Sequence, residues 1–181
     1  MKEFSFLTFP ILKTERLTLR ALTFDDVESI FELRSSKEVN KLITRKTPKN
    51  LEDAKEFISV CHQEFTNKNR IFWAIEFNKK IIGTIVLYRI SSETEYAEIG
   101  YELFPTYHQK GFMSEAMTAV LKFEAEHLKL KTIEAFTHKN NMASRSLLEK
   151  HHFVFQPTRR EKGFENNRIF KLEVESLKRI S

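Results

Sequence analysis

The sequence predicts one α/β domain, built on a mixed, mostly antiparallel sheet of about seven strands with helices on both faces. Segments with the period of a strand alternate along the chain with segments that have the period of a helix. The passage 96–138 has the order strand–helix–strand, which normally makes a right-handed crossover between parallel strands. No linker rich in Pro, Gly or Ser interrupts the chain, so we expect a single domain over 1–181 with its core at about 12–174.

Strands are predicted where polar and apolar residues alternate, or where β-branched and aromatic residues cluster. The expected strands are 16–22, 70–77, 81–90, 96–104, 132–138, 153–160 and 168–174. Asn78-Lys79-Lys80 is a short polar turn between the second and third strands, which should therefore form a hairpin. A polar turn also separates the last two strands, which should form another.

Helices are predicted where an apolar stripe with helical spacing follows a capping residue. Thr23 lies three residues before Asp26, and Asn50 lies three before Asp53, which are capping arrangements. The helices are expected after Asp26, over 51–65, over 114–128, and from Asn140 or Asn141 to about His151.

The composition is typical of a globular protein, with 41% apolar and 30% charged residues. The single Cys61 excludes a disulfide within the chain and a multi-cysteine metal site, and we expect no metal. The net charge of +5 suits an anionic ligand. The 25 acidic residues are interspersed with the 30 basic ones, which argues against nucleic acid as a direct partner.

Neither a membrane span nor a secretion signal is predicted. No apolar run reaches the roughly 18 residues that a transmembrane helix needs. The segment 1–9 lacks a long apolar core and a small-residue cleavage site. We therefore expect a cytoplasmic location and no membrane partner.

One basic loop, between a predicted strand and a predicted helix, says most about function. It runs Tyr107-His108-Gln109-Lys110-Gly111-Phe112-Met113-Ser114-Glu115-Ala116. Unpaired backbone N–H groups at a helix start and the helix dipole both favour a bound phosphate. Gly111 would let the backbone approach that phosphate closely. We expect a phosphorylated ligand here.

This loop belongs to an ordered series of motifs. They are the segments 14–26, 82–84, 98–103, 107–116, 141–144 and 148–153. Their order and spacing resemble the Gcn5-related N-acetyltransferases (GNAT), specifically the branch of bacterial ribosomal-protein N-terminal acetyltransferases (RimJ/RimL-like). Two positions depart from the family pattern, because Gln109 replaces the first glycine of the loop and His152 replaces a helix-ending glycine. The side chain of Gln109 must therefore point away from the ligand or contact it.

The resemblance implies acetyl-CoA as donor substrate. Its pyrophosphate would bind the backbone of Gln109, Lys110, Gly111, Phe112, Met113 and Ser114. Lys110 could add a charged contact or remain an exposed lysine. The pantetheine arm would run beside Tyr101, Glu102, Leu103 and Phe104. Asn141 would contact this arm, unless it serves only as a helix cap.

The resemblance also implies direct attack of a primary amine on the thioester through a tetrahedral intermediate. Glu98 is the expected general base, acting through water or on an amine of depressed pKa, or else a charge that only holds the acceptor. Strand alternation places Glu102 on the same face, so it could share this role. Ser144 is expected to stabilise the leaving thiolate by a hydrogen bond, or to be a plain helix-surface serine.

The acceptor is left open. Protein N-terminal amines are the substrate after which the branch is named, but similar sequences acetylate polyamines, amino acids and antibiotics. The first two helices, the loop 44–49 and the hairpin 160–167 should build the acceptor side. A non-catalytic acetyl-CoA sensor and an RNA-binding protein are the alternatives to an enzyme, and the chain could be a monomer or a homodimer.

Overall fold

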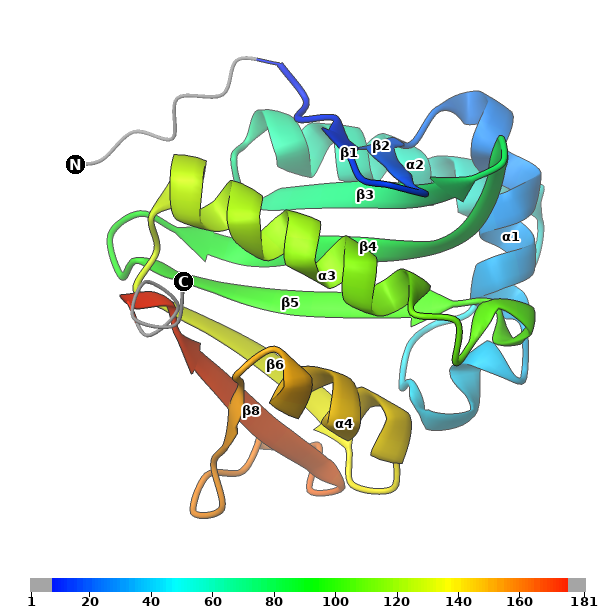
Figure 1. Cartoon of the computed structure of the whole chain (residues 1–181). Helices are drawn as coiled ribbons and strands as arrows, with labels where there is room; N and C mark the ends of the chain where they lie inside the picture. The colour runs from blue at the N-terminus through cyan, green and yellow to red at the C-terminus, as the bar shows by residue number, and fades with distance from the viewer. Residues whose placement is uncertain (1–7, 176–181) are drawn as a thin grey trace.

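The computed structural model describes residues 8–175, which form one eight-stranded mixed sheet between two pairs of helices (Figure 1). The strands are β1 (Leu12–Lys13), β2 (Thr18–Ala21), β3 (Arg70–Phe77), β4 (Lys80–Ser91), β5 (Tyr96–Leu103), β6 (Thr132–His138), β7 (Val154–Phe155) and β8 (Asn167–Glu173). Their order in the sheet is β1-β2-β3-β4-β5-β6-β8-β7, and only the β5–β6 pair is parallel. The predicted fold class is confirmed.

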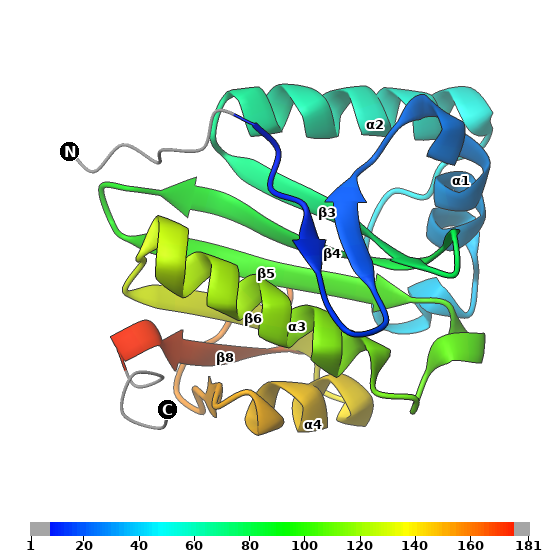
Figure 2. The same ribbon diagram turned by 45° about the horizontal axis from the view of Figure 1, so that its top comes forward.

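The helices are α1 (Val27–Ser35), α2 (Leu51–Thr66), α3 (Phe112–Phe123) and α4 (Met142–Lys150). A π-helical turn, Glu124–Leu128, continues α3. Helices α1 and α2 cover one face of the sheet, while α3 and α4 cover the other (Figure 2). Each face has its own apolar core, and α3 forms the crossover that makes β5 and β6 parallel.

Three predicted boundaries were wrong. Helix α3 begins at Phe112 and not at 114, because Gly111 is its N-cap, with a φ of 78°. The strand predicted at 153–160 shrinks to β7, because Pro157 has no N–H to donate to a ladder. The strand predicted at 16–22 shortens to β2. The two-residue strand β1, which was not predicted, brings the sheet to eight strands.

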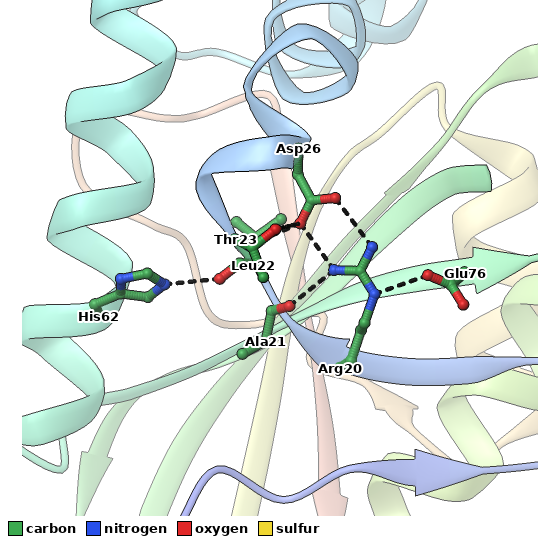
Figure 3. A network of polar contacts seen from close by, with 7 residues as sticks. All are labelled: Arg20, Ala21, Leu22, Thr23, Asp26, His62 and Glu76. Carbon is green, nitrogen blue, oxygen red and sulfur yellow. Dashed lines mark hydrogen bonds and ion pairs between the residues drawn. The ribbon is translucent and has the colours of Figure 1, made fainter. Parts of the chain in front are cut away.

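A polar network explains the first motif of the chain (Figure 3). Arg20 donates to both carboxylate oxygens of Asp26, at 2.8 and 2.9 Å, and to Glu76 at 2.8 Å. Asp26 also accepts the backbone N–H of Thr23 at 2.7 Å. Burial alone would raise the pKa of Asp26, but these hydrogen bonds outweigh it and hold that pKa below its usual value. The motif thus ties β2 to β3 and to the start of α1.

Neither a membrane-spanning helix nor a cluster of metal ligands is found among the described residues. No helix between residues 8 and 175 has the length and apolar character that crossing a membrane needs. Within the same residues, no three His, Cys, Asp or Glu side chains gather as metal ligands would.

Candidate active site

The parallel strands β5 and β6 separate soon after they pair. Their register covers only Tyr96–Glu98 against Thr132–Glu134, and the strands diverge beyond it (Figure 1). The far edge of β5 is bonded to β4, and the far edge of β6 to β8. The facing edges therefore carry backbone groups that a bound extended ligand can pair with, in the manner of an added strand.

A cavity of about 540 Å³ lies on the α3 side of this opening, and we call it the α3-side cavity. The end of β5, the loop after it, the start of α4 and the turn Val39–Leu42 form its walls. The predicted donor-site residues that line it are Tyr101, Glu102, Leu103, Gln109, Gly111, Phe112, Met113, Ser114 and Asn141. Lys110 and Phe104 are not part of its lining.

The loop before α3 contains two residues with left-handed backbone. Gln109 has a φ of 59° and Gly111 a φ of 78°, so both lie in the left-handed region. This conformation costs a non-glycine residue about 1–2 kcal/mol. The first turn of α3 follows at once, and its N–H groups have no partner within the helix. Gln109 thus has a backbone conformation that glycine adopts without steric cost.

The side chain of Lys110 turns back onto its own loop. Its Nζ donates to the carbonyl oxygen of Thr106 at 2.7 Å. Its carbonyl oxygen accepts from Arg16 Nη1 at 3.0 Å, and Arg16 Nε donates to Glu115 at 2.7 Å. The Arg16 guanidinium also lies 4.3 Å from the centroid of the Phe112 ring. Sequence reasoning missed Arg16 as a support of the loop, because only the fold brings it there.

A pair of hydroxyl groups lies where the opening meets α4. Tyr101 Oη and Ser144 Oγ are 2.7 Å apart and hydrogen bonded. The Ser144 N–H donates to Asn141 Oδ1 at 3.1 Å, so Asn141 is the N-cap of α4 as well as a wall of the cavity. Burial raises the pKa of Tyr101, which keeps its phenol protonated and able to donate.

The two carboxylates on β5 have different surroundings. Glu98 is 4% exposed, accepts from Arg89 at 2.9 Å and from Tyr96 Oη at 3.2 Å, and lines neither the α3-side cavity nor a second cavity, which lies on the α1 and α2 side of the opening. Glu102 lines both cavities and forms ion pairs with Arg45 at 2.5 Å and Arg34 at 3.5 Å. A base role for Glu98 stays a prediction.

Gly83 gives the motif at 82–84 a structural role. A Cβ added at Gly83 would lie 2.3 Å from the carbonyl oxygen of Glu102. Only glycine lets β4 pass this closely beside the end of β5, so the segment 82–84 fixes the position of the strand that carries Glu102.

A second cavity of about 490 Å³ lies on the α1 and α2 side of the opening, and we call it the α1-side cavity. Its walls include Arg34 of α1, Arg45 of the loop 44–49, Phe57 of α2 and Phe164 of the hairpin before β8. The two cavities share the residues Leu42, Ile43, Tyr101, Glu102, Asn141 and Ser144. They therefore meet at the opening between β5 and β6.

Comparison with known proteins shows the family. Residues 16–154 match the model of the acetyltransferase (GNAT) domain. The chain belongs to the GNAT family. It is 33% identical, over 171 residues, to the uncharacterized N-acetyltransferase YoaA of Bacillus subtilis (strain 168), with 93% of this chain and 97% of the relative covered. The predicted family is confirmed: the protein is an N-acetyltransferase, and acetyl-CoA is its donor substrate.

Solved GNAT structures share the fold. An acetyltransferase from Bacillus anthracis superposes with a TM-score of 0.73 at 27% identity, covering 92% of this chain and 99% of the other. RimL, a ribosomal L7/L12 alpha-N-protein acetyltransferase in complex with coenzyme A, superposes with a TM-score of 0.78 at 15% identity. That comparison covers 92% of this chain and 99% of RimL, and at this identity it concerns the fold alone.

Proposed function

We propose that the protein acetylates a primary amine, with acetyl-CoA in the α3-side cavity and the amine in the α1-side cavity. The observation that carries this proposal is the meeting of the two cavities at the opening between β5 and β6. The thioester and the amine would reach each other there, beside Tyr101 and Ser144. Direct transfer through a tetrahedral intermediate needs no further carrier group.

The loop and the first turn of α3 would hold the pyrophosphate of the donor. Left-handed backbone at Gln109 and Gly111, followed by the free N–H groups of Phe112, Met113 and Ser114, suits an anion. The pantetheine arm would pair with the open edge of β5 near Tyr101 and Leu103, between that strand and Asn141. Lys110 contributes charge near this site and stiffness to its turn.

The hydroxyl pair would assist departure of the thiolate. A free thiol has a pKa of about 8.5, so a donated hydrogen bond stabilises the thiolate as it forms. Either hydroxyl can donate in the bond between Tyr101 and Ser144, and when Tyr101 donates, Ser144 has its own hydrogen for the sulfur. The open N–H groups on β5 would receive the oxyanion.

Of the two carboxylates, we favour Glu102 as the group that orients the amine and accepts its proton through water. It lines both cavities, whereas Glu98 is enclosed by Arg89 and Tyr96. Arg34 and Arg45 form ion pairs with Glu102 and hold it in place, which favours the orienting part of this role.

The test is an acceptor screen that follows thiol release from acetyl-CoA over protein N-terminal peptides, polyamines, amino acids and aminoglycosides. Calorimetry with coenzyme A runs beside it. Turnover with at least one amine class supports the proposal. Tight binding of coenzyme A without turnover of any class would instead support a non-catalytic sensor.

A further inference from the structure

We propose that the natural acceptor is a small amine that also carries a carboxylate or phosphate, and that Arg34, Arg45 and Arg70 bind this anionic group. The inference rests on the proposed function, because it assigns the acceptor to the α1-side cavity. A volume of about 490 Å³ lies within the range of small-molecule sites.

More positive than negative side chains line this cavity. Arg34, Arg45 and Arg70 line it, against the carboxylates Glu102 and Glu161. Glu161 already accepts a hydrogen bond from Asn167 Nδ2 at 2.7 Å. A polyamine would bring two or more positive charges toward three guanidinium groups, whereas an anion would complete the balance.

Arg45 provides a specific donor. Its Nε donates to Asn40 Oδ1 at 2.7 Å, and its Nη1 is paired with Glu102 at 2.5 Å. Its Nη2 is buried and has no hydrogen-bond partner among the described residues. A buried guanidinium nitrogen without an acceptor is unfavourable, so an oxygen of a bound ligand would satisfy it.

Arg34 and Arg70 place two further guanidinium groups on the same wall. Arg34 stacks on Phe57 at 3.8 Å and shares Glu102 with Arg45, so one carboxylate faces two cations. Arg70 lies near the buried Cys61, and no carboxylate between residues 8 and 175 forms an ion pair with it. Among the described residues, Arg34 and Arg45 therefore share a single carboxylate, and Arg70 has no ion-pair partner.

The remaining wall indicates the rest of the acceptor. Aromatic side chains line it, namely Phe57, Phe72, Tyr88, Phe136 and Phe164. An acceptor that places its amine at Glu102, its anionic group among the arginines and an apolar body against these rings would satisfy every part of the site.

The test compares acceptors that differ only in the anionic group. One arm uses L-phenylalanine against L-phenylalaninamide, and the other uses glucosamine 6-phosphate against glucosamine, with spermidine as the cationic reference. We expect the anionic member of at least one pair to have a kcat/KM about tenfold or more above that of its neutral partner. The arm that responds tells carboxylate from phosphate.

Two variants tie this preference to the cavity. Arg70→Gln should raise KM for the anionic acceptor about tenfold and leave KM for the neutral acceptor and for acetyl-CoA within about twofold. Lys122→Gln removes an exposed charge from α3 and should keep the preference. Faster turnover of the neutral members or of spermidine would overturn the inference and leave the acetyltransferase standing. No turnover of any acceptor would contradict the proposed function, and the inference with it.

Discussion

At the scale of single residues, Ser144 and Tyr101 form a hydrogen bond of 2.7 Å at the junction of the two cavities. Ser144→Ala should lower kcat about 10- to 100-fold, which is the value of one hydrogen bond to a charged group. KM for acetyl-CoA should change little, because the thiolate exists only as the reaction proceeds. Steady-state kinetics checks this, with the exposed Ser59→Ala on α2 as control, and wild-type turnover in Ser144→Ala would remove the serine from the mechanism.

The two β5 carboxylates give a second prediction. Glu102→Gln should lower kcat/KM for the amine at least about tenfold, since it removes a charge from the junction of the cavities. Glu98→Gln should affect turnover less, because Glu98 is occupied by Arg89 and Tyr96. Acetyl-CoA affinity, measured by calorimetry, should stay nearly constant in both. The reverse order of effects would return the base role to Glu98.

This contrast also shows how far residue-level prediction could go. The strand period correctly placed Glu98 and Glu102 on one face of β5. Which of them reaches the cavities depends on where β5 and β6 separate, just beyond Glu98, and this is a property of the whole sheet. Arg16, Arg34 and Arg70 were not predicted for the same reason, because each acts across elements that are distant in the sequence.

At the scale of elements, the loop before α3 is under conformational strain. Gln109→Gly should raise the free energy of unfolding by up to about 1 kcal/mol, because glycine adopts a φ of 59° without steric cost and loses only part of this gain to chain entropy. Gly111→Ala should lower it by about 1 kcal/mol, since alanine resists a φ of 78°. Urea unfolding measures both, and a Gln109→Gly variant less stable than wild type would contradict the assigned backbone.

Helices α3 and α4 are joined by Ser114 and His151, whose Oγ and Nε2 atoms lie 3.0 Å apart. Burial, with help from Lys150 and His152, lowers the pKa of His151 to about 4. The folded state therefore binds the proton less well than the unfolded chain, whose histidine has a pKa of 6.5. This contribution to stability is complete above about pH 6.5 and is lost as the pH falls toward 4.

The expected loss is about 1–2 kcal/mol over that interval, after allowance for the half-exposed ring. His151→Gln keeps a hydrogen-bonding side chain without a titrating group, so its unfolding free energy should fall less between pH 7 and pH 4. Parallel pH dependence in the variant and the wild type would show that His151 stays accessible to protons.

Most elements followed from local patterns, but some of their ends did not. Thr23 caps the 3₁₀ turn Phe24–Asp26 that leads into α1, and Asn50 caps α2, so local capping signals predicted where the first two helices begin. The start of α3 was missed because Gly111 caps it through its backbone conformation, which leaves no side-chain signal. The short strand β1 was missed because two residues are too few to show the alternation of polar and apolar residues that is typical of a strand.

At the scale of the whole molecule, the two layers of helices and the splayed strands create one path through the sheet. The α3-side cavity carries the backbone suited to phosphates, and the α1-side cavity carries arginines and aromatic rings. The family match and the shared cavity residues make this path the central claim: donor and acceptor enter from opposite faces and meet at the opening.

An NMR titration of the ¹⁵N-labelled protein with coenzyme A, followed by an acceptor that the screen identifies, tests this claim most directly. The account predicts that coenzyme A shifts the amides of residues 109–114 and 141–144, and that the acceptor then shifts those of Arg34, Arg45 and Arg70. Coenzyme A shifts confined to the α1-side cavity, or both ligands acting on one face of the sheet, would contradict it.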